Sequence, residues 1–101
     1  MKVNVDFFKT ITGAWEMEHF DKQRTTVIKV DSINFGQDDT VVLKGPITKQ
    51  SPARATICYE LCLIINPNSY HIESGGPTGY VLKHYNQAES ITLKKIILEN
   101  L

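Results

Sequence analysis

The residues best suited to chemistry in this chain are three histidines, His19, His71 and His84. Imidazole can bind a metal or move a proton near neutral pH. Metal-binding histidines usually recur at short spacing with one another or with cysteines, and these three are far apart in sequence. The sequence therefore predicts no metal site and no bound cofactor, although two histidines that converged in the fold could bind a metal or an anionic head group.

The local pattern indicates which way the histidines face. His19 alternates with Trp15 and Met17 on one side of a predicted strand, and His84 alternates in the same way with Tyr80. Tyrosines on apolar registers supply a wall with a few polar groups, as a small-molecule pocket requires. Five side chains are therefore expected to line an interior: Met17, His19, Tyr59, Tyr80 and His84. In a small barrel the same side chains could instead fill the core.

No catalytic constellation is evident. The run Ser74–Gly79 contains three glycines but lacks the Gly-Lys-Ser/Thr ending of a phosphate-binding loop and leads into a predicted strand, so a hairpin turn is expected. The carboxylates lie in predicted turns or on outward faces, and no serine stands in a nucleophile motif. An enzyme is the less favoured interpretation.

Composition narrows the class of partner. The 101 residues carry eleven basic and eleven acidic side chains, so the whole chain has no long-range attraction to nucleic acid or to an anionic membrane. Lys44, Lys49 and Arg54 make the segment around 45–52 the most basic one, as in oligonucleotide-binding barrels, but no aromatic stripe accompanies them. We expect a cytoplasmic protein, because the first residues do not resemble a signal peptide and no apolar run could span a membrane.

Cys58 and Cys62 lie four residues apart on one predicted strand. At ~3.3 Å per residue their Cα atoms would be ~13 Å apart, beyond the ~7 Å limit for a disulfide. We therefore expect two small, buried or half-buried thiols that do not pair.

The pattern along the chain is mostly that of short strands. Residues 5–12 suggest one or two helical turns, with Asp6 as N-cap and Gly13 after the end. Strands are expected at 14–21, 25–35, 40–44, 53–65, 70–73, 78–85 and 90–97. A change of phase near Asp31-Ser32 requires a bend or bulge. Residues 45–52, with two prolines, are expected to form a loop, and the last strand also fits helical spacing.

Two segments resemble known barrels. Gly13-Ala14-Trp15, after a helical lead-in, resembles the Gly-x-Trp signature that opens the first strand of lipocalins and related calycins. The hairpin that joins 80–85 to 90–96 is similar to the closing hairpin of fatty-acid-binding proteins. The resemblance implies that Trp15 closes one end of a barrel. It implies no ligand class, because the arginine and tyrosine pair that holds a fatty acid's carboxylate is missing from the last strand.

The sequence thus predicts a single domain, 1–101, that is mainly β: a small antiparallel meander β-barrel of seven or eight strands with a short N-terminal helix, of calycin type. The predicted function is non-enzymatic binding of a small apolar or amphipathic molecule inside the barrel, with Gly13 and Trp15 in structural roles. The alternative is a protein interaction module of inhibitor or immunity type, in which an outer face, the 45–52 segment or an open sheet edge makes the contact. An open edge would also allow a homodimer.

Overall fold

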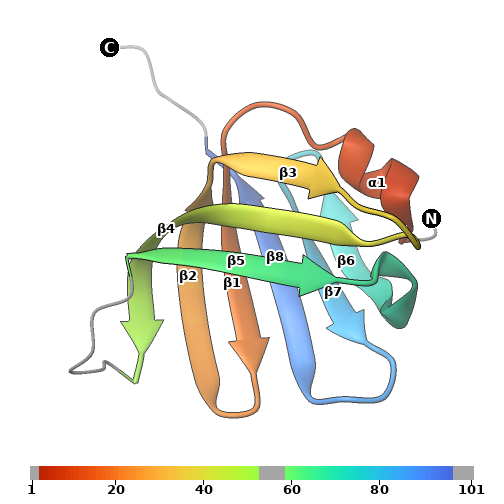
Figure 1. Cartoon of the computed structure of the whole chain (residues 1–101). Helices are drawn as coiled ribbons and strands as arrows, with labels where there is room; N and C mark the ends of the chain where they lie inside the picture. Colours follow the sequence, from red (N-terminus) through yellow and green to blue (C-terminus); the bar gives the residue numbers. More distant parts are fainter. Residues whose placement is uncertain (1–2, 53–58, 97–101) are drawn as a thin grey trace.

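A computed structural model describes residues 3–52 and 59–96. It shows one short helix followed by eight antiparallel strands that curl into a half-barrel (Figure 1). The elements are α1 (Val5–Lys9), β1 (Trp15–Asp21), β2 (Arg24–Val30), β3 (Ser32–Phe35), β4 (Val41–Ser51), β5 (Glu60–Ile65), the 3₁₀ turn η1 (Pro67–Ser69), β6 (Tyr70–Gly76), β7 (Gly79–His84) and β8 (Glu89–Lys95). The predicted fold class is confirmed.

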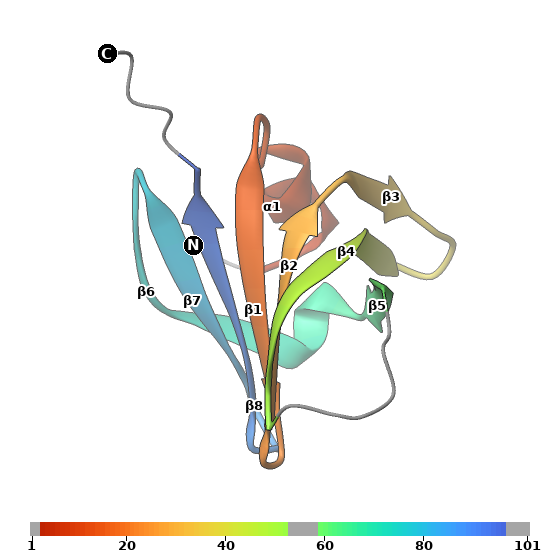
Figure 2. The same cartoon turned by 90° about the vertical axis from the view of Figure 1, so that its left-hand side faces the viewer.

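The strands follow the order β3-β4-β2-β1-β8-β7-β6, and β5 also pairs with β4. The first strand therefore lies between the second and the last, so β1 and β8 pair in the middle of the sheet. Figure 2 shows the sheet curling from β6 and β7 on one side, through β1, to β3 and β5 on the other. This curl gives the molecule a concave inner face.

The core fills the inner face and extends to the end of the half-barrel where α1 lies, which we call the helix end. Met17, Ile28, Leu43, Leu82 and Ile91 are fully buried in this core, each on a different strand. Burial of such side chains stabilises a fold by roughly 1.5–3 kcal/mol each. The opposite end, at the β1–β2 turn, is called the hairpin end (Figure 1).

The helix covers the helix end of the core. Its N-cap is Asn4, whose Oδ1 accepts a hydrogen bond from the Phe7 backbone N–H at 3.0 Å, so the expected cap at Asp6 is wrong. Phe7 and Phe8 turn inward and are almost completely buried. The helix is shorter than predicted. Gly13 follows it with a backbone φ of +92°, which residues other than glycine rarely adopt.

Strand β4 corrects the predicted loop at 45–52, because residues 41–51 form one continuous strand. Its first half pairs with β3 and β5, and its second half crosses to pair with β2. Gly45 stands at the crossing: a Cβ there would lie only 1.9 Å from the Lys29 carbonyl oxygen. Gly45 and Pro46 mark a bend inside this strand. A glycine followed by a proline is also typical of a loop, so the local sequence does not distinguish the two.

Other expectations hold or shift by a few residues. The predicted bend at Asp31-Ser32 separates β2 from β3, and Glu89–Lys95 form a strand rather than a helix, while the predicted end of this strand at 97 lies outside the described residues. Ser74–Gly76, expected to be part of a turn, belong to β6. Cys62 is a free, exposed thiol, so its predicted burial is wrong, and Cys58 lies outside the described residues.

Candidate functional site

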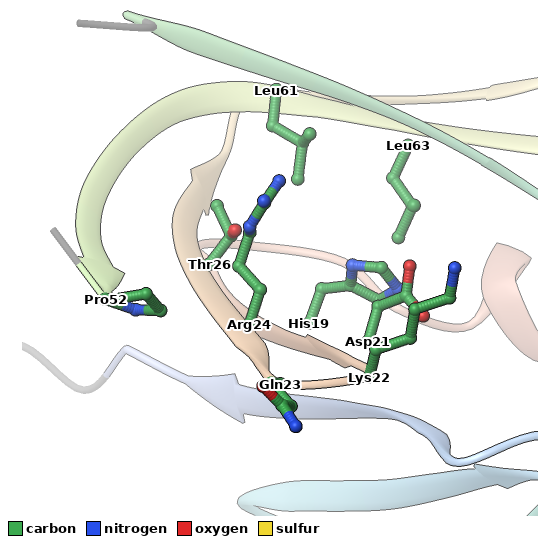
Figure 3. A pocket seen from close by; sticks show the side chains of 9 residues that line it. All are labelled: His19, Asp21, Lys22, Gln23, Arg24, Thr26, Pro52, Leu61 and Leu63. Carbon is green, nitrogen blue, oxygen red and sulfur yellow. The ribbon is translucent and has the colours of Figure 1, made fainter. Parts of the chain in front are cut away.

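The hairpin end of the inner face holds a hollow of about 740 Å³ (Figure 3). Its lining comes from the β1–β2 hairpin on one side and from β5 and the residue after β4 on the other: His19, Asp21, Lys22, Gln23, Arg24, Thr26, Pro52, Leu61 and Leu63. Ligand pockets in proteins typically measure about 300–1,000 Å³. The hollow is thus large enough to take a small organic molecule.

The two walls of the hollow differ in chemistry. Leu61 and Leu63, on the inner face of β5, point toward the hairpin from the apolar wall (Figure 3). Arg24 and His19 face them from neighbouring strands. His19 pairs with Thr26, and Asp21 with Arg24, in the register of β1 and β2, so His19 and Arg24 are diagonal neighbours on one face. An apolar wall thus faces a polar wall with a guanidinium and an imidazole.

His19 is held in place by Glu89 of β8. The His19 Nε2 lies 2.9 Å from the Glu89 Oε2, and both side chains are about one-seventh exposed. The register explains the contact: Asp21 pairs with Glu89 and His19 with Ile91, so the two side chains are diagonal neighbours on the inner face. The imidazole is therefore oriented by a partner that is itself largely buried.

Tyr70 of β6 reaches the same carboxylate across β7. Its hydroxyl donates a short hydrogen bond to the Glu89 Oε2, the oxygen that also contacts His19. Burial raises the pKa of Tyr70 far above its ordinary value of 10.0, and its hydrogen bond to Glu89 raises it further. The phenol therefore stays protonated and donates.

Glu89 stays ionised despite its burial. Burial raises its pKa, but the hydrogen bonds from Tyr70 and His19, together with the positive charge that His19 and His84 carry when protonated, outweigh that effect, so the pKa lies below its ordinary value of 4.5. An ionised carboxylate only accepts hydrogen bonds. Within the described part of the chain, no buried side-chain nitrogen or oxygen lacks a partner.

His84 contacts the cluster of His19, Glu89 and Tyr70 through the Tyr70 ring. Its ring packs edge-on against Tyr70, with the ring centroids 5.1 Å apart. Its Nδ1 accepts hydrogen bonds from the backbone N–H groups of Asn86 and Gln87, at 3.0 and 3.1 Å. His84 thus shapes the β7–β8 turn and supports the Tyr70 ring, and it is not part of the lining of the hollow.

The other predicted lining residues lie elsewhere. Met17 is fully buried in the core, and Tyr59, just before β5, is 78% exposed. Tyr80 packs at the helix end, where its ring lies 5.0 Å from Phe7 and 6.3 Å from Trp15. The structure therefore brings His19 and His84 toward one cluster and does not bring them together with Met17, Tyr59 or Tyr80.

Trp15 and Gly13 occupy the helix end. Trp15 is buried, and its Nε1 donates a hydrogen bond to the Thr12 carbonyl oxygen at 2.9 Å. The indole thus lies under α1 and ties the chain that leads into β1 to the core. This position is far along the strand from the hollow, on the other side of Met17 from His19.

The sequence does not assign Glu89, Tyr70 or Arg24 to a site, and of the three only Tyr70 falls on the apolar register of its predicted strand. Glu89 was assigned to a turn, and only the pairing of β1 with β8 places it beside His19. Leu61 and Leu63 alternate with polar residues in the sequence, which indicates an inward face but not a site. The signal that could have indicated the site joins two distant segments: His19 faces inward on the first strand, and the carboxylate of Glu89 stands at the start of the last strand, which pairs with the first.

Comparisons with protein-family models, with curated proteins and with solved structures gave no match. No helix in residues 3–52 and 59–96 is long and apolar enough to cross a membrane. The same residues contain no group of three or more histidine, cysteine, aspartate or glutamate side chains arranged to hold a metal ion.

Proposed function

We propose that the protein binds a small amphipathic molecule in the hollow at the hairpin end of a calycin-type half-barrel. The observation that carries this proposal is the contrast between the two walls of one concave site, Leu61 and Leu63 against His19 and Arg24. An apolar part of a ligand would lie against the leucines, and a polar part would lie against the hairpin. The Gly13-Ala14-Trp15 triplet after a short helix supports the calycin assignment.

The site lies closer to the hairpin than the sequence alone suggested. Of the five side chains expected to contact ligand, His19 lines this hollow, whereas Met17 and Tyr80 belong to the packed helix end. The packed core and the proposed ligand site would therefore share the inner face of one half-barrel. Binding would leave the packed end unchanged.

The first test compares two neighbouring positions on β5. Leu63 is half-buried and lines the hollow, whereas Ile64 is 65% exposed on the opposite face. Because removing apolar contact area weakens binding, Leu63→Ser should weaken binding of the apolar fluorophore N-phenyl-1-naphthylamine about fivefold to tenfold. Ile64→Ser is the matched control and should leave the affinity unchanged. Equal effects of the two substitutions would exclude the hollow as the site.

The second test identifies what the protein carries. Native mass spectrometry of protein purified from its own host should show a mass increment of a few hundred daltons that is lost on denaturation. A particle that carries only a second copy or another protein would favour the interaction module over ligand binding. Circular dichroism of each variant confirms that the fold is retained.

A further inference from the structure

The hydrogen bonds of His19 indicate which of its ring nitrogens can accept a hydrogen bond from a ligand. The Nε2 atom faces the Glu89 carboxylate, which accepts hydrogen bonds and is already bonded by the Tyr70 hydroxyl. Nε2 must therefore carry the proton, since an ionised carboxylate has none to give. In a neutral imidazole with Nε2–H, the other nitrogen, Nδ1, is an acceptor.

This acceptor is open to the hollow. His19 is one of the lining residues, and its ring stands at the floor of the site with Leu63 above it (Figure 3). Within residues 3–52 and 59–96, Nδ1 makes no hydrogen bond, and it is not among the buried atoms of these residues that lack a partner. Arg24, the diagonal neighbour, offers only donors.

A hydroxyl group matches this pair of contacts. It has one hydrogen to donate to Nδ1 and lone pairs that can accept from the guanidinium. An ether lacks the hydrogen, and a carboxylate would meet the Nδ1 lone pair with a second acceptor. We propose that the hollow selects amphipathic molecules with a hydroxyl head group, such as alcohols or phenols, with His19 Nδ1 as acceptor and Glu89 and Tyr70 as positioning residues.

This proposal rests on the proposed function, and three probes of one shape separate the two. The probes are 2-naphthol, 2-methoxynaphthalene and 2-naphthoate, titrated at pH 7.5, where free imidazole is mostly neutral. Because losing a hydrogen bond typically weakens binding about tenfold, 2-naphthol should bind about tenfold more tightly than its methyl ether. If none of the three probes binds, both the proposed ligand binding in the hollow and the hydroxyl selectivity are wrong. If the ether binds as well as 2-naphthol, only the selectivity is wrong.

Variants assign the selectivity to the histidine. His19→Phe should bind 2-naphthol and its ether equally, with the ether affinity close to that of the wild type, because only the acceptor is lost. His71→Phe, on β6 and outside the lining, is the matched control and should keep the tenfold preference. Retention of the preference in His19→Phe would overturn the proposal.

The tautomer can be read without any ligand. Long-range ¹H–¹⁵N NMR separates a protonated from an unprotonated ring nitrogen, so the His19 signals should show a bare Nδ1 and a protonated Nε2. This measurement needs only the wild-type protein and therefore does not depend on how well a variant folds. A protonated Nδ1, or tighter binding of 2-naphthoate than of 2-naphthol, would overturn the proposal, since both mean that the imidazole donates into the hollow.

Discussion

Replacement of Tyr70 by phenylalanine isolates the bond that holds the Glu89 carboxylate. The substitution keeps the buried ring and removes only the hydroxyl that donates to Glu89. A hydrogen bond to a charged group contributes about 1.5–3 kcal/mol. Because the Glu89 side chain is 14% exposed, water can replace part of the lost bond. The free energy of unfolding should therefore fall by about 1.5–2 kcal/mol, at the low end of that range.

For a domain of this size the loss corresponds to a fall of about 6–10 °C in Tm. Urea unfolding followed by circular dichroism at pH 7 measures it directly. Tyr80→Phe is the matched control: Tyr80 is half-buried, and its hydroxyl makes no hydrogen bond within the described residues, so its removal should change stability by less than about 0.5 kcal/mol. If Tyr70→Phe costs no more than Tyr80→Phe, the Tyr70–Glu89 bond is not a stabilising contact.

The same difference should depend on pH in a defined direction. The pKa of Glu89 is lowered in the folded protein, so the unfolded chain takes up the proton first as pH falls. The stabilisation is fully present above the ordinary value of 4.5 and is lost as pH falls through the lower, folded value. The gap between wild type and Tyr70→Phe should therefore be constant from pH 7 to about 5 and close on further acidification.

Two glycine substitutions test the backbone around the sheet. Gly45→Ala should lower the free energy of unfolding by about 3 kcal/mol or prevent folding, because its Cβ would overlap the Lys29 carbonyl. Gly36→Ala is its control: a Cβ there makes ordinary contact, so the free energy of unfolding in urea should change by less than about 0.5 kcal/mol. Gly13→Ala should cost about 1–2 kcal/mol from its positive φ alone, since nothing lies within 4 Å of the added atom. Gly76→Ala, equally open but without a positive φ, is its control, and equal losses at the two sites would contradict the role given to φ.

Much of the fold follows from alternation along single strands. The inward face of β1 was predicted correctly, because a strand that is buried on one side alternates every two residues. Leu61, Leu63 and Ile65 of β5 alternate with exposed residues in the same way. The bend at Asp31-Ser32 was visible for the same reason, as a shift in phase. Tyr59 continued the apolar alternation but lies just before β5 and is largely exposed.

What the sequence did not reveal depends on contacts between distant segments. The strand that contains Gly45 and Pro46 carried the signals of a loop, and its pairing with three other strands overrides them. Glu89 looked like a turn residue until the first and last strands were paired. The candidate site combines His19 of the first strand with Glu89 of the last, and no local sequence pattern indicates that these two residues are in contact.

The crossing at Gly45 bears on the size of the molecules that the hollow could admit if it binds ligand as proposed. One wall of the hollow is carried by the β1–β2 hairpin and the other by β5, and the two are joined through β4, which bends between them. The angle of that bend therefore sets the width of the opening. A change at the bend could admit longer or bulkier molecules while every side chain that touches them stays the same. A shift in the preferred probe length in a bend variant with an unaltered lining would show it.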